Sequence, residues 1–512
     1  MTGPRHGPND VVDAVVIGTG AGGAPIAARL AQAGLSVVAL DAGRAFLPDE
    51  HVADELSADL YWLDERLSGG ADPTAFGANN SGKGVGGSTL HWGAFCPRPD
   101  PRDMALRTLT GQGEDWPVAH TDLVPYLAEV EGFLGVSGPR DYPWDAARRY
   151  PLPPVARNAS ADAMARGCAA LGITATDAPA ALVSRDWAQP HWGQRQACVN
   201  CGTCHQGCRN ASKASMDTSY LPLAQAHGAE VRAGCMVHGL DRDAQGRITG
   251  VVYRQNGHDV RQRCGAVFLC AGGVETPRLL LNLDLANSSG QVGRNFMAHV
   301  ATQVWGRFPA DMRMNRGYPS SLITEDMMRP EGVGHAGGYL IQSLGVLPVN
   351  LATGLARGAG LWGERLQTIL RGYNRMAGIG INGECLPHAD NRLTLADEVD
   401  AFGHRKARID FSYHANEQAI DRHARRTLSD IWAAAGAQDI FAVDRSAHTI
   451  GTCRMGHDGD TAVVDSDGRS FDIANLRICD NSIFPSALAA NPALTIMALS
   501  LRTADRFLAS DD

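Results

Sequence analysis

The sequence predicts an α/β fold that contains a Rossmann-like dinucleotide-binding domain. An apolar, β-branched run near the N-terminus leads directly into a glycine-rich turn, which is followed by an Ala-rich stretch of helical character. A second short apolar run ends on an acidic residue about 20 positions after the turn, as this type of domain requires. A strand-to-helix turn beyond residue 265 indicates that the same fold resumes after a long insertion.

The first βαβ unit can be assigned element by element. Residues 11–17 are predicted as a strand because β-branched residues dominate them. The turn GTGAGG occupies residues 18–23, and a helix is expected over residues 24–33. A second strand is expected over residues 35–40, immediately before Asp41.

Glycine is required at three positions of this turn for different reasons. Gly18 lets the backbone turn tightly, Gly20 lets it approach a pyrophosphate closely, and Gly23 lets the helix pack on the strand. The anion then lies at the helix N-terminus, and Asp41 accepts hydrogen bonds from a ribose. Strand, turn, helix and acid together predict a nucleotide site, and the alternative is a glycine-rich turn that binds nothing.

Later segments extend the same sheet. Residues 230–234, 248–253 and 266–270 are predicted as strands, and the last of them runs into a helix over residues 271–281. Residues 340–355 are mildly apolar, but polar residues interrupt them and the stretch is shorter than the roughly 20 residues of a membrane span. We expect a buried segment or the wall of a substrate pocket there.

Composition excludes several classes of protein. With 44% hydrophobic and 20% charged residues, the 512-residue chain is typical of globular proteins. Its net charge is −9 and no sustained basic patch is present, so we expect no nucleic-acid partner. The first apolar run contains an acid and continues into the glycine turn, so we expect neither a signal peptide nor a transmembrane segment, and the cytoplasm as the compartment.

A second glycine box and several later segments carry a resemblance to a known family. Residues 84–93 read GVGGSTLHWG, residues 271–277 read AGGVETP, residues 293–299 read GRNFMAH and residues 391–395 read NRLTL. Together with the C-terminal motifs, they resemble the glucose–methanol–choline (GMC) family of FAD-dependent oxidoreductases. One departure is Trp92, where the family often has Asn.

The C-terminal motifs are the most specific part of this resemblance. They read HTIGTCRMG at 448–456, LRICDNSIFP at 476–485 and NPALTI at 491–496. The resemblance implies bound FAD and the oxidation of a sugar, polyol or other primary or secondary alcohol to an aldehyde or ketone, with hydride transfer to flavin N5. His448 and Asn491 match the family's catalytic His and its partner. The implied flavin contacts are Gly86, Gly87, Ser88, Thr89, Asp480, Asn491 and Pro492.

The resemblance also implies two interleaved domains. The FAD-binding domain is expected from residues 11–135, 198–300 and 444–512. The substrate-binding domain, an α+β unit built on an antiparallel sheet, is expected from residues 136–197 and 301–443.

The chemistry of the two C-terminal residues agrees with these roles. A neutral His is a suitable base for an alcohol proton because its ordinary pKa is about 6.5. Asn491 can orient the substrate oxygen by a hydrogen bond but cannot titrate, and its alternative role is to cap the helix expected after Pro492. We assign structural roles to His91 and His299.

Four of the twelve cysteines are clustered. Cys198, Cys201, Cys204 and Cys208 have the spacing of a bacterial ferredoxin run, except that Arg209 stands where that run has Pro. Three readings stay open, namely an iron–sulfur cluster, a zinc site, and a structural or disulfide-bearing loop. An iron–sulfur cluster would accept electrons one at a time from the reduced flavin.

The expected partner is a small-molecule alcohol, and oxygen, a dye, a quinone or a protein could each accept the electrons. A flavin-containing lyase of the hydroxynitrile type is the main alternative, and it is distinguished by whether substrate bleaches the flavin. An iron–sulfur electron-transfer flavoprotein is a third reading. An NAD(P) dehydrogenase is disfavoured because its fold has no role for the second glycine box.

Overall fold

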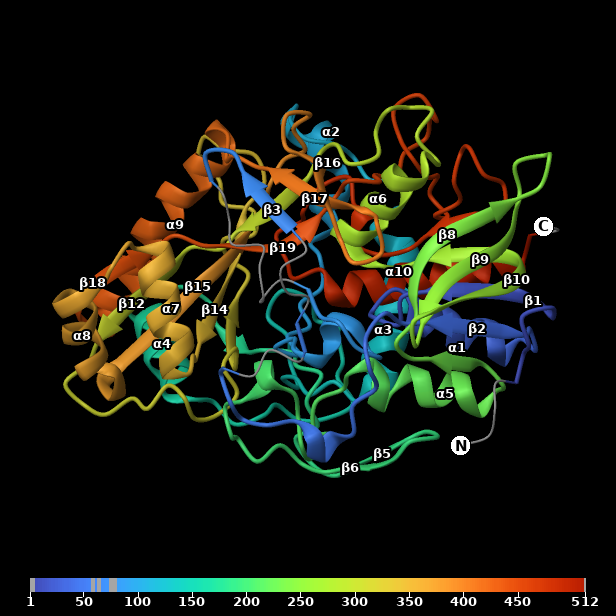
Figure 1. Cartoon of the computed structure of the whole chain (residues 1–512). Coiled ribbons are helices and arrows are strands. Elements are labelled where there is room, and N and C mark those ends of the chain that lie inside the picture. Colours follow the sequence, from blue (N-terminus) through green and yellow to red (C-terminus); the bar gives the residue numbers. More distant parts are fainter. Residues whose placement is uncertain (1–4, 57–59, 62–65, 73–80, 511–512) are drawn as a thin grey trace.

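The computed structural model describes residues 5–56, 60–61, 66–72 and 81–510. Two large β-sheets lie on opposite sides of the molecule, and a small three-stranded sheet lies between them at the top of the view in Figure 1. Each large sheet has its own apolar core on a helix-covered face.

The first sheet has the strand order β7-β2-β1-β10-β9-β8, with β20 paired to the end of β10. The strands from β7 to β10 and β20 run parallel, whereas β8, β9 and the first half of β10 form an antiparallel meander. The strands are β1 (Val11–Ile17), β2 (Val37–Leu40), β7 (Glu230–Arg232), β8 (Met236–Arg242), β9 (Ile248–Gln255), β10 (His258–Leu269) and β20 (Leu476–Ile478).

Helices pack against this sheet because their apolar stripes match its buried, β-branched face. The central one, α1 (Gly23–Gln32), contacts α5 (Tyr220–Ala226) and α10 (Ala493–Leu508), and α10 in turn contacts α3 (His120–Leu134). The predicted α/β class with a Rossmann-like unit is confirmed. The strand predicted at 266–270 is longer than expected, because β10 starts at His258 in a hairpin with β9.

The second sheet is antiparallel and has the order β18-β12-β15-β14-β13-β4, with β11 joining β15 to β19. Helices α4 (Ala159–Ala170) and α9 (Ala415–Ala434) cover one of its faces. The strands are β4 (Thr176–Asp177), β11 (Met297–Val300), β12 (Gln303–Arg307), β13 (Leu322–Thr324), β14 (Tyr339–Leu344), β15 (Met376–Gly383), β18 (Gln438–Val443) and β19 (Ser446–Ile450).

The remaining elements connect the two sheets. They are β3 (Arg66–Gly69), β16 (Arg392–Val399) and β17 (Arg405–Asp410) in the three-stranded sheet, β5 (Trp187–Gln189) and β6 (Gly193–Arg195) in a hairpin, and the helices α2 (Leu106–Thr110), α6 (Gly272–Leu283), α7 (Pro348–Gly358) and α8 (Gly363–Arg371). Strands β11 and β19 belong to the second sheet although the sequence placed them in flavin-domain segments, so the domain limits at 300 and 444 stay predictions. None of the helices described is long and apolar enough to cross a membrane.

Candidate active site

A cavity of about 1040 Å³ lies in the described part of the chain. Its lining comes from the ends of β1 and β2, from the start of α10, and from strands β12, β14, β15 and β19 of the second sheet. Leu344, Leu351 and Leu355 also line it, so the prediction of a pocket wall within residues 340–355 is confirmed.

The two glycine motifs meet back to back at this cavity. A Cβ atom added to Gly87 would lie 2.7 Å from the Cα atom of Gly20, and Gly87 has a φ of +56°. Both residues line the cavity. Segments more than 60 positions apart therefore approach so closely that only backbone separates them.

The other predicted glycines make close backbone contacts or hydrogen bonds that hold the two turns in this arrangement. Gly18 has a φ of +95°, and a Cβ there would lie 2.4 Å from the carbonyl oxygen of Cys270. A Cβ on Gly23 would lie 1.9 Å from the carbonyl oxygen of Gly18, as expected where helix packs on strand. The N–H of Gly86 donates to Thr19 Oγ1 (3.0 Å), which ties the second glycine turn to the first.

Asp41 lies at the end of β2 and lines the cavity. Its Oδ2 accepts hydrogen bonds from the N–H (3.2 Å) and hydroxyl (2.6 Å) of Thr19, and its Oδ1 accepts one from the N–H of Gly43 (2.9 Å). Burial raises the pKa of this carboxyl to about 6. Oδ1 accepts only one of these bonds and has capacity for another, so a ribose hydroxyl can be held here as well.

The residues present fit a dinucleotide such as FAD. His91 and Trp92 line the cavity beside the second glycine turn, and within the described residues His91 Nε2 and Trp92 Nε1 are buried without a hydrogen-bond partner. Buried polar groups are normally paired, so these atoms are available to a bound group. Ser88 and Thr89 line the same wall, although their hydroxyls already bond to Gly82 N and Gly86 O.

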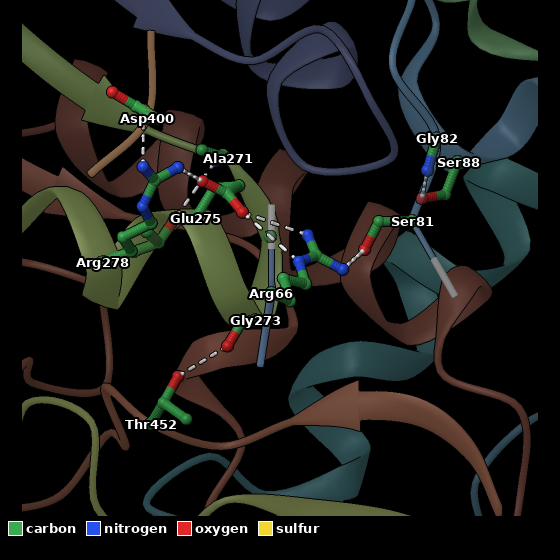
Figure 2. Close-up of polar contacts among 12 residues, drawn as sticks. Arg66, Ser81, Gly82, Ser88, Ala271, Gly273, Glu275, Arg278, Asp400 and Thr452 are labelled. Carbon is green, nitrogen blue, oxygen red and sulfur yellow. Dashed lines mark hydrogen bonds and ion pairs between the residues drawn. The ribbon is translucent and has the colours of Figure 1, made fainter. Parts of the chain in front are cut away.

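A buried ionic network forms another part of the wall (Figure 2). Arg66 NH2 lies 3.2 Å from Glu275 Oε1, and Arg278 NH1 lies 3.0 Å from Glu275 Oε2. Arg278 NH2 reaches Asp400 Oδ2 at 2.5 Å, and Arg66 NH1 donates to Ser81 Oγ at 2.7 Å. The network fastens β3, the first turn of α6 and the β16–β17 turn to one another around the cavity. Glu275 belongs to the AGGVETP segment, but no motif indicated Arg66, Arg278 or Asp400.

Asp480 holds the start of α6 in place. Its Oδ2 accepts from the N–H of Gly272 (2.8 Å) and the hydroxyl of Thr276 (2.6 Å), and its Oδ1 accepts from the N–H of Ser482 (2.8 Å). Thr452 closes the same corner by donating to the Gly273 carbonyl (Figure 2). Asp480 lines the cavity, as does Pro492, so both predicted residues lie at the site.

His448 and His299 form a pair at the opposite end of the cavity. Their Nδ1 atoms lie 2.9 Å apart, and His299 Nε2 lies 3.1 Å from the carbonyl oxygen of Leu488. A carbonyl can only accept, so His299 donates from Nε2 and, when neutral, accepts at Nδ1. His448 must then donate from its Nδ1, which leaves the lone pair of its Nε2 free. The structural role assigned to His299 was therefore incomplete, because it fixes the tautomer of His448.

A β-bulge brings the two rings together. The β11–β19 register shifts between Met297, which faces Ile450, and His299, which faces Ala447. The extra residue falls at His448 or Thr449, and His448 has a φ of +64°, which is uncommon for a residue other than Gly. Bulges redirect side chains and are frequent beside active sites. No pattern in the sequence indicates this bulge.

Both imidazoles are held neutral. Burial lowers the pKa of His299 to about 4. Burial is the main cause that lowers the pKa of His448 well below its usual 6.5, and the neighbouring His299 and Arg445 add to it, because a second cation beside them is unfavourable. The pair therefore contains an unprotonated base at neutral pH.

Asn491 lines the same cavity as His448 and lies in the loop that precedes α10. Its Oδ1 accepts a hydrogen bond from Nδ2 of Asn382 on β15 (3.0 Å). Helix α10 starts at Ala493 with Pro492 as its N-cap and no side-chain cap, so the alternative of Asn491 as a helix cap is wrong. Its amide N–H groups are left to face the cavity or a ligand.

The cysteine loop lies behind the second glycine box, and none of its four cysteines lines the cavity. Cys204 is buried, Cys201 is exposed, and all four thiols are free. In the part of the chain that the structure describes, no three His, Cys, Asp or Glu side chains are arranged to hold a metal ion. His205 connects the loop to the cavity, since it lines the cavity and its Nδ1 lies 3.0 Å from the carbonyl oxygen of His91.

A buried cation stabilises this loop. Lys213 is 1% exposed, and its Nζ donates to the carbonyl oxygens of Leu90 (2.8 Å), Trp92 (3.2 Å) and Cys204 (2.6 Å). One ammonium group thus joins the glycine box to the cysteine run. Burial lowers the pKa of Lys213.

Comparisons with known proteins find relatives along almost the whole chain. Residues 68–301 and 387–500 match two family models, both described as GMC oxidoreductase. The chain is 30% identical to the fructose dehydrogenase large subunit of Gluconobacter japonicus, over 97% of each chain. It is 29% identical to the 2-methyl-1,2-propanediol dehydrogenase of Mycolicibacterium austroafricanum, over 97% of this chain and 95% of that one. The solved structure of pyridoxine 4-oxidase from Mesorbium loti shares the fold, with a TM-score of 0.66 and 16% identity over 98% of this chain and 100% of that one.

Proposed function

The chain belongs to the GMC oxidoreductase family and is an FAD-dependent enzyme that oxidises alcohols; from this premise we propose which of its residues hold the cofactor and which carry out the reaction. Gly18, Gly20, Gly87 and Asp41 would hold the dinucleotide part of FAD, because all four line the cavity, where the glycines let a ligand approach the backbone closely and Asp41 supplies an acid. When bound, FAD supplies the acceptor for the hydride of the alcohol carbon.

His448 is the base in this proposal. The observation that carries it is the hydrogen bond to His299, which places the only proton of the neutral His448 ring on Nδ1. Nε2 is then ready to take the hydroxyl proton of the alcohol, while the O–H and C–H bonds break and the C=O bond forms. The imidazolium that results keeps its Nδ1–H on His299 Nδ1, so the pair needs no rearrangement during proton transfer.

Asn491 orients the alcohol oxygen. Asn382 occupies its Oδ1, so only the two N–H donors of the Asn491 amide remain for a ligand. A donor to the oxygen stabilises the negative charge that develops as the proton leaves. His448 and Asn491 thus divide the work between proton acceptance and positioning.

The test is anaerobic flavin bleaching by a panel of alcohols. Replacing His448 with Ala should leave FAD content unchanged and slow the bleaching by about 10²–10⁴-fold, the usual worth of a positioned base. Asn491→Ala should have a smaller effect. His457→Ala is the matched control, because His457 is exposed and outside the cavity lining. Equal bleaching rates in His448→Ala and the wild type would remove His448 from the mechanism, and a flavin that no alcohol bleaches would favour a lyase.

The iron–sulfur cluster on Cys198, Cys201, Cys204 and Cys208 remains a proposal supported by their spacing. The loop lies between the cavity and the surface, with His205 on the cavity side and Cys201 exposed. A cluster there would carry electrons from the flavin to an external acceptor. Iron and acid-labile sulfide analysis with EPR on anaerobically purified protein tests it. Absence of both would leave a structural loop and would not affect the FAD assignment.

A cytoplasmic location is also a proposal. The twelve cysteines are all free, which is the state expected in a reducing compartment. Cell fractionation with detection of the full chain tests this, and recovery outside the cytoplasmic fraction would contradict it.

A further inference from the structure

Two glutamines stand on the cavity face of the second sheet. Gln303 of β12 and Gln342 of β14 both lie directly opposite Gly380 of β15 in the register of the strands. Residues opposite one another across antiparallel strands share a face, so the two amides flank a position that has no side chain. All three residues line the cavity.

The opposite face of the same strands settles the orientation. Val304, Ile341 and Ile379 alternate with the residues above, and all three are buried in the core under α4 and α9. Alternation along a strand puts the amides on the other side, toward the cavity. The two amides therefore present polar groups to the cavity from the face that α4 and α9 do not cover.

The amide row continues to the catalytic residues. Asn382 follows Gly380 by two positions on β15 and therefore shares its face. Its Nδ2 donates to Asn491 Oδ1 (3.0 Å), the residue proposed to orient the reacting oxygen. Two residues of a strand span about 7 Å, so the glutamines lie at the distance of a hydroxyl several carbons from the reacting one.

The buried, unpaired side-chain oxygen of Gln342 favours a ligand beside the two glutamines. Within the described residues, Gln342 Oε1 is buried without a hydrogen-bond partner, which is costly unless a ligand supplies a donor. A Cβ on Gly380 would lie 3.0 Å from Leu344 Cδ1 and 3.4 Å from Gln303 Cγ, so glycine is the residue that fits here without displacing the neighbouring side chains. An amide both donates and accepts, which matches a neutral hydroxyl group.

We infer that the substrate is a polyhydric alcohol, a polyol or neutral sugar, and that Gln303 and Gln342 bind one of its non-reacting hydroxyl groups. This inference rests on the proposed function, since it places the reacting hydroxyl at His448 and Asn491. Trp305, two residues after Gln303 on β12, also lines the cavity and offers an apolar wall to the carbon chain. Specificity of this kind comes from the cost of leaving buried amides unpaired when the second hydroxyl is missing.

The experiment compares alcohols of equal carbon number with the FAD-loaded enzyme under argon. The probes are 1-hexanol, 1,6-hexanediol, the common hexitols and the neutral hexoses, and the rate and dissociation constant of flavin reduction are measured for each. The variants are Gln303→Met and Gln342→Met, because methionine keeps the length of glutamine and removes its polar atoms. Gln438→Met is the matched control, since Gln438 is exposed on the edge strand β18.

The wild type should reduce its flavin fastest with at least one polyhydric probe. Each cavity variant should lose about 10-fold in the ratio of rate to dissociation constant for that probe. Neither variant should lose activity with 1-hexanol, and Gln438→Met should match the wild type. Flavin content and melting temperature check that the variants are folded.

Two kinds of failure are distinguishable. If 1-hexanol serves as well as every polyhydric probe, or if the cavity variants lose activity with all alcohols equally, the amide inference is wrong and the proposed function stands. If no alcohol, including 1-hexanol, bleaches the flavin, the proposed function itself fails and the inference fails with it.

Discussion

The two ends of the cavity are built from different materials. The glycine end, formed by residues 18–23 and 84–93, presents backbone, and its residues are close together because no side chains separate them. The histidine end, formed by His299, His448, Asn382 and Asn491, presents side chains whose hydrogen bonds to one another fix their atoms. A group common to many enzymes can be held by backbone, whereas a reaction and its substrate need particular side chains.

The same contrast explains which residues of the cavity can be predicted from the sequence. The glycine end consists of contiguous motifs whose spacing reflects a local βαβ unit, so the sequence alone predicts that Gly18, Gly20 and Asp41 lie together, and all three line the cavity. His448 and Asn491, which also line it, are predicted only through motifs that resemble a family. His299, Asn382 and the two cavity glutamines come from strands whose pairing is long-range, and a β-bulge decides where His448 points.

Adding one methyl group at Gly87 should abolish FAD binding, and this is the largest effect that we expect. Gly87→Ala would place a Cβ 2.7 Å from the Gly20 backbone, so the two turns must separate and the protein should be purified without FAD. Gly363→Ala is the control, because Gly363 has nearly the same φ (+59° against +56°) but no atom within 4 Å of the added Cβ.

The control should keep its FAD and lose only the roughly 1–2 kcal/mol of stability that a left-handed Ala costs. FAD titration of the apoprotein, followed by flavin fluorescence, measures the affinity of each variant. Wild-type affinity in Gly87→Ala would show that the close contact of the two turns is not needed for binding.

Not every part of the wall follows this division. The ionic network of Arg66, Glu275, Arg278 and Asp400 uses side chains, yet it lies beside the glycine motifs (Figure 2). It joins three elements that are separate in sequence, which a backbone contact could not do over such a distance. Buried pairs of this kind are strongly destabilising when one partner is removed, so its role is to hold the wall together.

The histidine end should respond more gradually, because its function depends on hydrogen bonds. His299→Leu removes the acceptor for His448 Nδ1–H and should slow flavin reduction by about 10- to 100-fold, the cost of a buried donor left unpaired. His299→Asn can place an amide oxygen near the former Nδ1 and should recover part of the rate. Stopped-flow reduction under argon measures both variants.

A structural role alone would not change the pH profile. His299 helps to lower the pKa of His448, so its removal should move the acid limb of the reduction rate to higher pH. Equal losses in the Leu and Asn variants, with a lower melting temperature and an unchanged pH profile, would reduce His299 to a packing residue.

The smallest effect that we expect concerns the wild type, in which the limiting rate of flavin reduction should not change with pH around 6.5. Because the pKa of His448 lies well below 6.5, the base stays unprotonated as the pH falls through that value. The limiting rate of flavin reduction should therefore be constant from alkaline pH through 6.5, where a His with its ordinary pKa would already be half protonated. An inflection near 6.5 would mean that burial does not hold His448 neutral.

Stability should follow the same groups with a definite sign. The pKa of His299 is about 4 in the folded chain and about 6.5 in the unfolded chain, so between these values the unfolded state binds more protons. The free energy of unfolding must then decrease as the pH falls from 6.5 to 4. Because Leu cannot titrate, His299→Leu should show a shallower decrease over this range than the wild type. Urea unfolding of both proteins at several pH values measures the two slopes, and equal slopes would mean that His299 is already protonated in the folded enzyme.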